Sequence, residues 1–236
     1  MIHSDNLSLD KKNIDTILVI DFGSQYTQLI ARRIRELNVF SEILPWDVSA
    51  EKIKSLNPNG VILSGGPESV TESNTPRIPK TIFELDVPVL GICYGMQTLA
   101  EQFGGQVTSS KNKEFGHAKI VIESSSLLLD GFIPGSSVDV WMSHGDHVST
   151  LPNEFNLIAS TPSAPIAGME HANKPIYALQ FHPEVTHTKQ GKMILENFTF
   201  KICKCSAQWK IENLIEQRIN EIKEKVGDQK VLLGLS

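Results

Sequence analysis

One cysteine of the chain lies between two glycines, in the segment Gly91-Ile92-Cys93-Tyr94-Gly95. A buried strand is predicted before it and a helix after it, so the segment resembles the G-x-S-x-G nucleophile elbow with a thiol in place of the hydroxyl. The glycines permit a strained turn that projects Cys93 alone, and the helix N-terminus favours the thiolate over the thiol. Taken alone, the motif leaves two interpretations open, because a free cysteine is most often a small buried apolar residue.

A nucleophilic thiolate needs a base, and seven histidines are available. His182 stands out because it follows the apolar run 175–181 and precedes a proline, which favours extended geometry. In an extended segment His182 and Glu184 point to the same side, so the carboxylate can orient the imidazole. The sequence therefore predicts a Cys93-His182-Glu184 triad, although a His-Pro-Glu loop found alone is more often a surface turn.

A glycine turn, Ser64-Gly65-Gly66-Pro67, follows another apolar run. Amide hydrolysis builds an oxyanion, and backbone N–H groups beside the elbow can stabilise it. We assign the N–H groups of Gly66 and Tyr94 as these two donors. Alone the turn would be an ordinary tight turn, and no Lys-Ser/Thr follows it to make a phosphate-binding loop.

The elements that must position these groups alternate along the first half of the chain. Apolar runs alternate with segments whose apolar residues recur at helical spacing. This alternation predicts a parallel sheet covered on both faces. The predicted strands are 15–22, 39–46, 59–66 and 87–93, and the predicted helices are 25–37, 49–56 and 94–103.

After residue 105 the pattern changes to short β-like runs, followed by helical periodicity. The runs are 118–124, 138–144, 156–161, 166–171 and 175–181, and the helices are 186–203 and 207–227. We therefore expect an α/β fold with an open, mostly parallel central sheet, helices on both faces and a β-rich second half.

Composition excludes several classes of function. The chain has 236 residues, 40% of them hydrophobic, and a net charge of −5 without a basic block, so nucleic acid is not an expected partner. No apolar run reaches the length of a membrane span and the N-terminus has no signal pattern, so we expect no membrane partner and a cytoplasmic protein. Three cysteines do not form a disulfide framework, and Cys203 with Cys205 makes a weak metal motif, so no metal site is expected.

The three motifs, in this order and spacing, resemble the triad-type class I glutamine amidotransferases. The segments 21–26, 30–33, 63–70 and 143–146 look more specifically like the glutaminase domain of glutamine-hydrolysing GMP synthetases. The resemblance implies that Cys93 attacks the glutamine carboxamide and that His182 relays protons. It also implies that Gln97 helps to bind glutamine, while the backbone of Ser143, His144 and Gly145 holds its α-amino and carboxylate ends.

The sequence pattern and the resemblance together predict the domain plan, and the resemblance implies the partners. A polar arm (1–14) precedes the amidotransferase domain (15–203), then come a linker helix (204–229) and the start of an ATP-pyrophosphatase domain (230–236). The glutaminase step needs no cofactor, whereas ATP and Mg²⁺ are expected only with the missing synthetase domain. That domain would use the ammonia to convert XMP to GMP, and the full-length protein is expected to be a homodimer.

Three rival hypotheses remain at this point. A glutaminase could serve a different acceptor, such as chorismate or carbamoyl phosphate synthesis. The fold could be a non-catalytic regulatory domain, although Cys93, His182 and Glu184 are all present. A cysteine peptidase or γ-glutamyl hydrolase could use a similar elbow, and it would release no ammonia.

Overall fold

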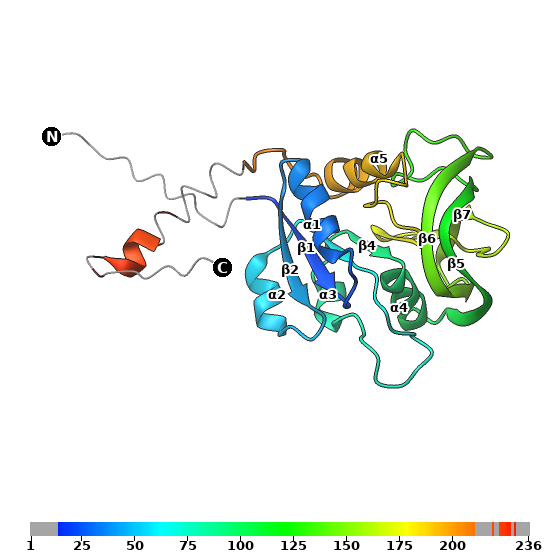
Figure 1. Cartoon of the computed structure of the whole chain (residues 1–236), viewed down its shortest axis with the longest axis horizontal. Coiled ribbons are helices and arrows are strands. Elements are labelled where there is room, and N and C mark those ends of the chain that lie inside the picture. Colours follow the sequence, from blue (N-terminus) through cyan, green and yellow to red (C-terminus); the bar gives the residue numbers. More distant parts are fainter. Residues whose placement is uncertain (1–13, 211–218, 220–221, 228, 230–236) are drawn as a thin grey trace.

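The computed structural model describes residues 14–210, 219, 222–227 and 229, and it contains a nine-stranded sheet in the order β2-β1-β3-β4-β9-β8-β7-β5-β6 (Figure 1). The strands are β1 (Thr16–Asp21), β2 (Phe40–Pro45), β3 (Gly60–Leu63), β4 (Val89–Ile92), β5 (Gln106–Ile122), β6 (Ser137–Thr150), β7 (Phe155–Ser160), β8 (Gly168–His171) and β9 (Ile176–Leu179). The helices are α1 (Thr27–Glu36), α2 (Ala50–Leu56), α3 (Lys80–Glu84), α4 (Tyr94–Gln102), α5 (Gly191–Glu196) and the π-helical η2 (Asn197–Ile202).

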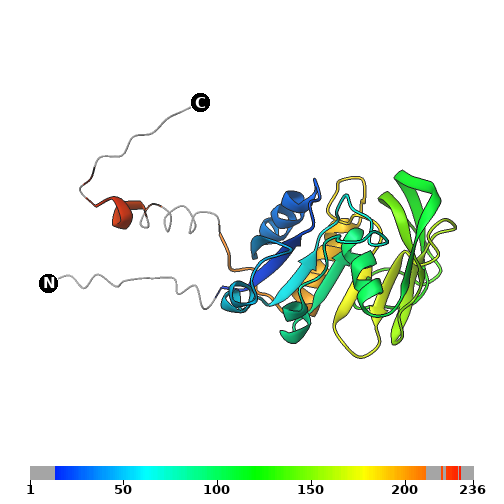
Figure 2. The same ribbon diagram turned by 90° about the horizontal axis from the view of Figure 1, so that it is seen from below.

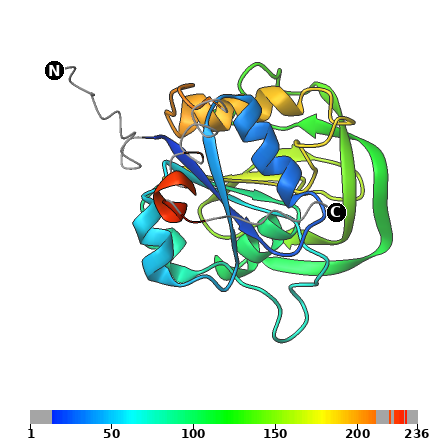
Figure 3. The ribbon, with the colours of Figure 1, turned by 60° about the vertical axis from the view of Figure 1, so that its left-hand side comes forward.

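The parallel part of the sheet comprises β2, β1, β3, β4 and β9. Successive side chains of a strand face opposite sides, so β1 places Ile17 and Val19 in one core and Leu18 and Ile20 in the other. Helices α1 and α5 lie side by side over the first core, whereas α2, α3 and α4 cover the second (Figures 1 and 3). The predicted two-faced α/β architecture is confirmed.

The antiparallel part continues from β9 through β8, β7 and β5 to β6. Figure 2 shows β5 and β6 at the opposite end of the molecule from β1 and α1. The predicted strands 118–124 and 138–144 are too short, because each strand extends well beyond its apolar run. Polar segments join the ladder since β5 and β6 pair along nearly their whole length, with register shifts between Gln106 and Val107 and between Ser109 and Glu114.

Other boundaries also differ from the sequence expectation. The predicted closing helix 186–203 begins only at Gly191 and changes to π-helical geometry after Glu196. Helix α3 was not predicted, because five residues give too little periodicity. The predicted arm and the segment 230–236 lie almost entirely outside the described residues. Of the predicted linker helix (204–229), residues 204–210 are not helical, residues 222–226 are helical, and much of the rest lies outside the described residues. In the described part of the chain, every helix is too short or too polar to cross a bilayer.

Candidate active site

The predicted elbow lies where β4 passes into α4. Cys93 has φ 53° and ψ −108°, a strained conformation for a residue with a Cβ atom. Two glycines make this turn possible, because a Cβ on Gly91 would lie 2.8 Å from Gly95 O and one on Gly95 would lie 2.4 Å from Leu63 O. The turn therefore presses α4 against β3 and leaves Cys93 projecting at the carboxyl ends of the strands.

Parallel pairing places the base beside the nucleophile. Ile92 at the end of β4 pairs with Leu179 at the end of β9, and the Cys93 N–H donates to Leu179 O at 2.8 Å. The chain leaving β9 then reaches His182, whose side chain is almost fully buried. Two strands that are far apart in the sequence thus deliver a thiol and an imidazole to the same edge of the sheet.

The His182 imidazole is held by a carboxylate. Nδ1 of His182 lies 2.7 Å from Oε1 of Glu184, and both side chains are buried. Burial alone would lower the pKa of His182, but the Glu184 charge and the hydrogen bonds to Cys93 and Glu184 raise this pKa well above 6.5. The raised pKa favours the imidazolium form of His182, which can form an ion pair with a Cys93 thiolate.

Replacing Glu184 with glutamine tests whether the negative charge of Glu184 raises the pKa of His182. The amide oxygen can still accept the Nδ1 proton, but the negative charge is lost, so the pKa of His182 should fall while the fold stays intact. We expect glutamate release from glutamine to drop by roughly 10²-fold or more. An NMR titration of His182 reports the pKa, and Glu36→Gln, a change in an exposed carboxylate, is the control. An unchanged His182 titration would contradict the role given to Glu184.

Strand β6 binds the backbone of the base and the side chain of the nucleophile. The His182 N–H donates to Trp141 O at 3.0 Å, and the Trp141 N–H donates to Thr188 Oγ1 at 3.1 Å. The Thr188 hydroxyl in turn donates to His182 O at 2.6 Å. Two residues further along β6, Ser143 O accepts from the Cys93 thiol at 3.5 Å. The antiparallel half of the sheet thus sets the position of the triad.

The predicted oxyanion loop lies directly beside the elbow. A Cβ on Gly65 would lie 3.3 Å from His182 Cε1 and 3.7 Å from Cys93 Cβ. The loop is held there because the Gly95 N–H donates to Ser64 O at 2.9 Å. Gly66 lines the same cavity as Cys93, and Tyr94, the residue after the nucleophile, is the first residue of α4. The donor roles of their N–H groups stay a prediction.

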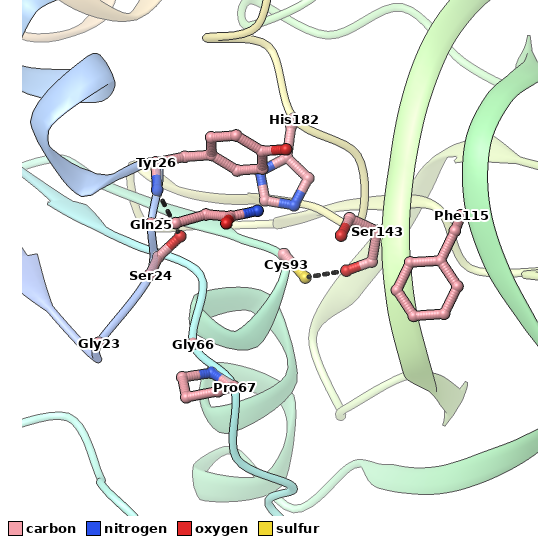
Figure 4. A pocket seen from close by; sticks show the side chains of 10 residues that line it. All are labelled: Gly23, Ser24, Gln25, Tyr26, Gly66, Pro67, Cys93, Phe115, Ser143 and His182. Carbon is pink, nitrogen blue, oxygen red and sulfur yellow. Dashed lines mark hydrogen bonds between the residues drawn. The ribbon is translucent and has the colours of Figure 1, made fainter.

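A cavity of about 330 Å³ opens above the thiol. Figure 4 shows Cys93 at the tip of α4 facing Ser143, with the Tyr26 ring beside His182. The two ring centroids are 5.2 Å apart in an edge-on arrangement. The lining residues are Gly23, Ser24, Gln25, Tyr26, Gly66, Pro67, Cys93, Phe115, Ser143 and His182.

The four residues expected to bind substrate occupy different positions. Ser143 lines the cavity, whereas the His144 side chain is buried on the other face of β6, 3.1 Å from Glu114. Burial lowers the pKa of His144, and the Glu114 charge opposes this only in part. Gly145 follows in β6, where an added Cβ would lie 3.6 Å from the Lys113 side chain. Gln97 is buried, and its Nε2 donates to Asp146 O at 2.7 Å.

Sequence reasoning missed Gln180. This residue is fully buried, and its Nε2 lies 3.8 Å from Cys93 Sγ. A signal was present, since Gln180 is a polar residue inside the otherwise apolar run 175–181, directly before the predicted base. The described residues contain no cluster of three His, Cys, Asp or Glu side chains that could hold a metal ion.

Comparison with known proteins gives a consistent result. Residues 18–202 match the profile of the family described as glutamine amidotransferase class-I. The chain is 54% identical, over 95% of its length, to the glutamine-hydrolysing GMP synthase of Hamiltonella defensa, and 56% identical, over 93%, to that of Teredinibacter turnerae. It spans 44% and 43% of the length of these relatives, less than half of each.

Solved structures support the same similarity. A protein of Thermoplasma acidophilum, described as a candidate GMP synthase component, is 33% identical and superposes with a TM-score of 0.71, with 88% of this chain and 98% of that one covered. A glutamine amidotransferase of Thermotoga maritima, 22% identical with a TM-score of 0.58 over 90% of this chain and 92% of that one, shares the fold.

Proposed function

Because the chain belongs to the class-I glutamine amidotransferase family, we propose that it hydrolyses L-glutamine to glutamate and ammonia through Cys93, His182 and Glu184. The single observation that carries this proposal is the buried imidazole of His182, which is held 2.7 Å from Glu184 and lines one cavity with a thiol on a strained elbow. This arrangement supplies a nucleophile, a base and an orienting carboxylate in one cavity.

The reaction begins when the Cys93 thiolate attacks the carboxamide carbon of glutamine. The Gly66 and Tyr94 N–H groups stabilise the oxyanion of the tetrahedral intermediate, and His182 protonates the departing ammonia. The C–N bond breaks and a γ-glutamyl thioester remains on Cys93. His182 then takes a proton from water, which attacks the thioester and releases glutamate and the thiol.

In the proposed reaction glutamine lies in the cavity above Cys93. Its α-amino and carboxylate groups contact the backbone of Ser143, His144 and Gly145, and Gln97 supports this side of the site from α4. Ser143 carries the strongest support, because it lines the cavity and its carbonyl contacts Cys93.

The relatives named as GMP synthases suggest the use of the ammonia. We extend the proposal to amination of XMP to GMP, which would take place in a synthetase domain that binds ATP and Mg²⁺. The full-length protein would be a cytoplasmic homodimer. Identity above 50% across more than nine-tenths of this chain supports GMP synthesis over an alternative acceptor such as chorismate.

A thioester trapped on Cys93 would test the glutaminase step. After a single turnover with glutamine and an acid quench, the peptide carrying Cys93 should gain the mass of one γ-glutamyl group. Glutamate and ammonia should appear in equal amounts. The peptide carrying Cys203 and Cys205 is the internal control and should stay unmodified, because burial raises the pKa of both thiols and neither lines the cavity.

The rival activities give different results in the same experiment. A peptidase would leave free glutamine intact and release no ammonia. A non-catalytic domain would give neither adduct nor glutamate. Ammonia release without an adduct on Cys93 would overturn the covalent mechanism while leaving the substrate assignment standing.

A further inference from the structure

The Cys93 sulfur has two polar neighbours besides His182. Ser143 O lies 3.5 Å from Sγ on one side, and Gln180 Nε2 lies 3.8 Å from it on the other. A carbonyl oxygen only accepts hydrogen bonds, so Ser143 O can bind the thiol but repels the thiolate. An amide N–H only donates, so Gln180 can bind the thiolate.

The orientation of the Gln180 amide decides which of its ends faces the sulfur. Its Oε1 lies 3.4 Å from Gln97 Nε2, and the same Nε2 lies 2.7 Å from Asp146 O. Because Asp146 O can only accept, it fixes the NH₂ group of Gln97 at that end. This NH₂ group then requires the oxygen of Gln180 to face it, so the Gln180 NH₂ group must point to the sulfur.

These hydrogen bonds form a relay from Asp146 through Gln97 to Gln180, and Asp146 is itself held firmly. The Asp146 carboxylate accepts hydrogen bonds from Ser69 in the loop after β3 and, at 2.6 Å, from Ser109 in β5. Gln97 is 3% exposed and Gln180 is 0% exposed, so no bulk water competes for their amide groups. Three elements of the fold thus hold a chain of hydrogen bonds that runs from Asp146 through Gln97 and Gln180 to the nucleophile.

We propose that Gln180 is a catalytic residue that stabilises the Cys93 thiolate by a hydrogen bond, and that Gln97 is the positioning residue that aims it. The proposal rests on the proposed function and deepens it. When the S–H proton passes to His182, the sulfur exchanges its bond to Ser143 O for the bond from Gln180. A neutral amide cannot take up that proton, so it favours the thiolate without competing with the base.

The Gln97 side chain acts on the nucleophile more than on the substrate. Both N–H groups of its side chain have partners within the protein, one on β6 and one on Gln180. Only the oxygen of Gln97 is left for other contacts. Its main effect on glutamine is therefore indirect and passes through the sulfur.

The test measures the alkylation rate of Cys93 by iodoacetamide as a function of pH, in the whole chain and without glutamine. Gln180→Leu should react roughly tenfold more slowly near neutral pH, with the midpoint of its rate profile at higher pH. Gln97→Leu should slow alkylation by a smaller factor. The double variant should react no more slowly than Gln180→Leu alone, because both changes remove the same hydrogen bond.

Gln102→Leu is the matched control. This glutamine lies on the same helix, and its amide binds the backbone of Ile78, away from the sulfur. Cys93 of the Gln102→Leu variant should be alkylated at the wild-type rate, whatever the melting temperature of that variant. A Gln180→Leu protein that melts and alkylates like the wild type would overturn the proposal.

If Gln180→Leu does not fold, Gln97→Leu decides the question by the same measurement, and a wild-type rate there would overturn the relay. Because alkylation needs no glutamine, failure of the relay is distinguishable from failure of the glutaminase assignment. A chain that forms the γ-glutamyl adduct but shows no effect at Gln180 would keep its function and lose only the relay.

Discussion

Replacing Cys93 with alanine is expected to lower glutamate release from glutamine by about 10⁴-fold or more. Cys93 is the one thiol among the residues that line this cavity, and without its sulfur His182 loses the nucleophile that it activates. The fold should survive, because the change removes one sulfur atom and keeps the Cβ atom at the strained turn. Coupled detection of glutamate together with a thermal melt measures both effects.

Cys203→Ala provides the matched control for that experiment. Cys203 is a second buried thiol whose sulfur packs against Gly60 at the start of β3. Burial raises the pKa of this thiol above its usual range, so it remains protonated and unreactive. Its removal should lower stability slightly and leave glutamate release unchanged. Equal glutamate release by Cys93→Ala and the wild type would refute the proposed function.

Gly95→Ala is expected to destabilise the protein by about 3 kcal/mol, near the upper end for overpacking a core. The new methyl group would lie 2.4 Å from Leu63 O and 2.8 Å from Leu63 Cβ. Neither can move easily, because β3 is paired on both sides, with β1 and with β4. Urea unfolding gives the free energy, and the same displacement of α4 should reduce glutamate release.

Gly145→Ala separates this clash from a general effect of removing a glycine. A Cβ on Gly145 would meet only the flexible Lys113 side chain, at 3.6 Å, so stability should stay within about 1 kcal/mol of the wild type. If Gly95→Ala were as stable as Gly145→Ala, α4 would have to move away from β3 at little cost. The close packing assigned to the elbow would then be wrong.

The triad and the parallel half of the sheet were predictable because each left a local signal. Glycines flank Cys93, a proline follows His182, and both residues come directly after apolar strands. Such strands end at one edge of a parallel sheet, so adjacency in space follows from the pattern. The contact between His182 and Glu184 needed only the alternation of an extended segment.

Other features had no local signal. The contact of Gln97 with Gln180 joins α4 to the end of β9, and it exists only because β4 and β9 pair as they do. The length of β5 depends on its partner β6, since its polar residues would not form a strand alone. These features depend on tertiary pairing, which a single sequence encodes only indirectly.

The carbonyl groups of Trp141 and Ser143 limit where this domain can gain or lose residues in evolution. They contact the base and the nucleophile from two points on one strand, although β6 contributes no side chain to the triad. An insertion or deletion between these points would turn one carbonyl away from its catalytic partner. Changes in chain length are therefore confined to the connections outside this stretch, such as residues 123–136, where they leave the spacing of the two contacts intact.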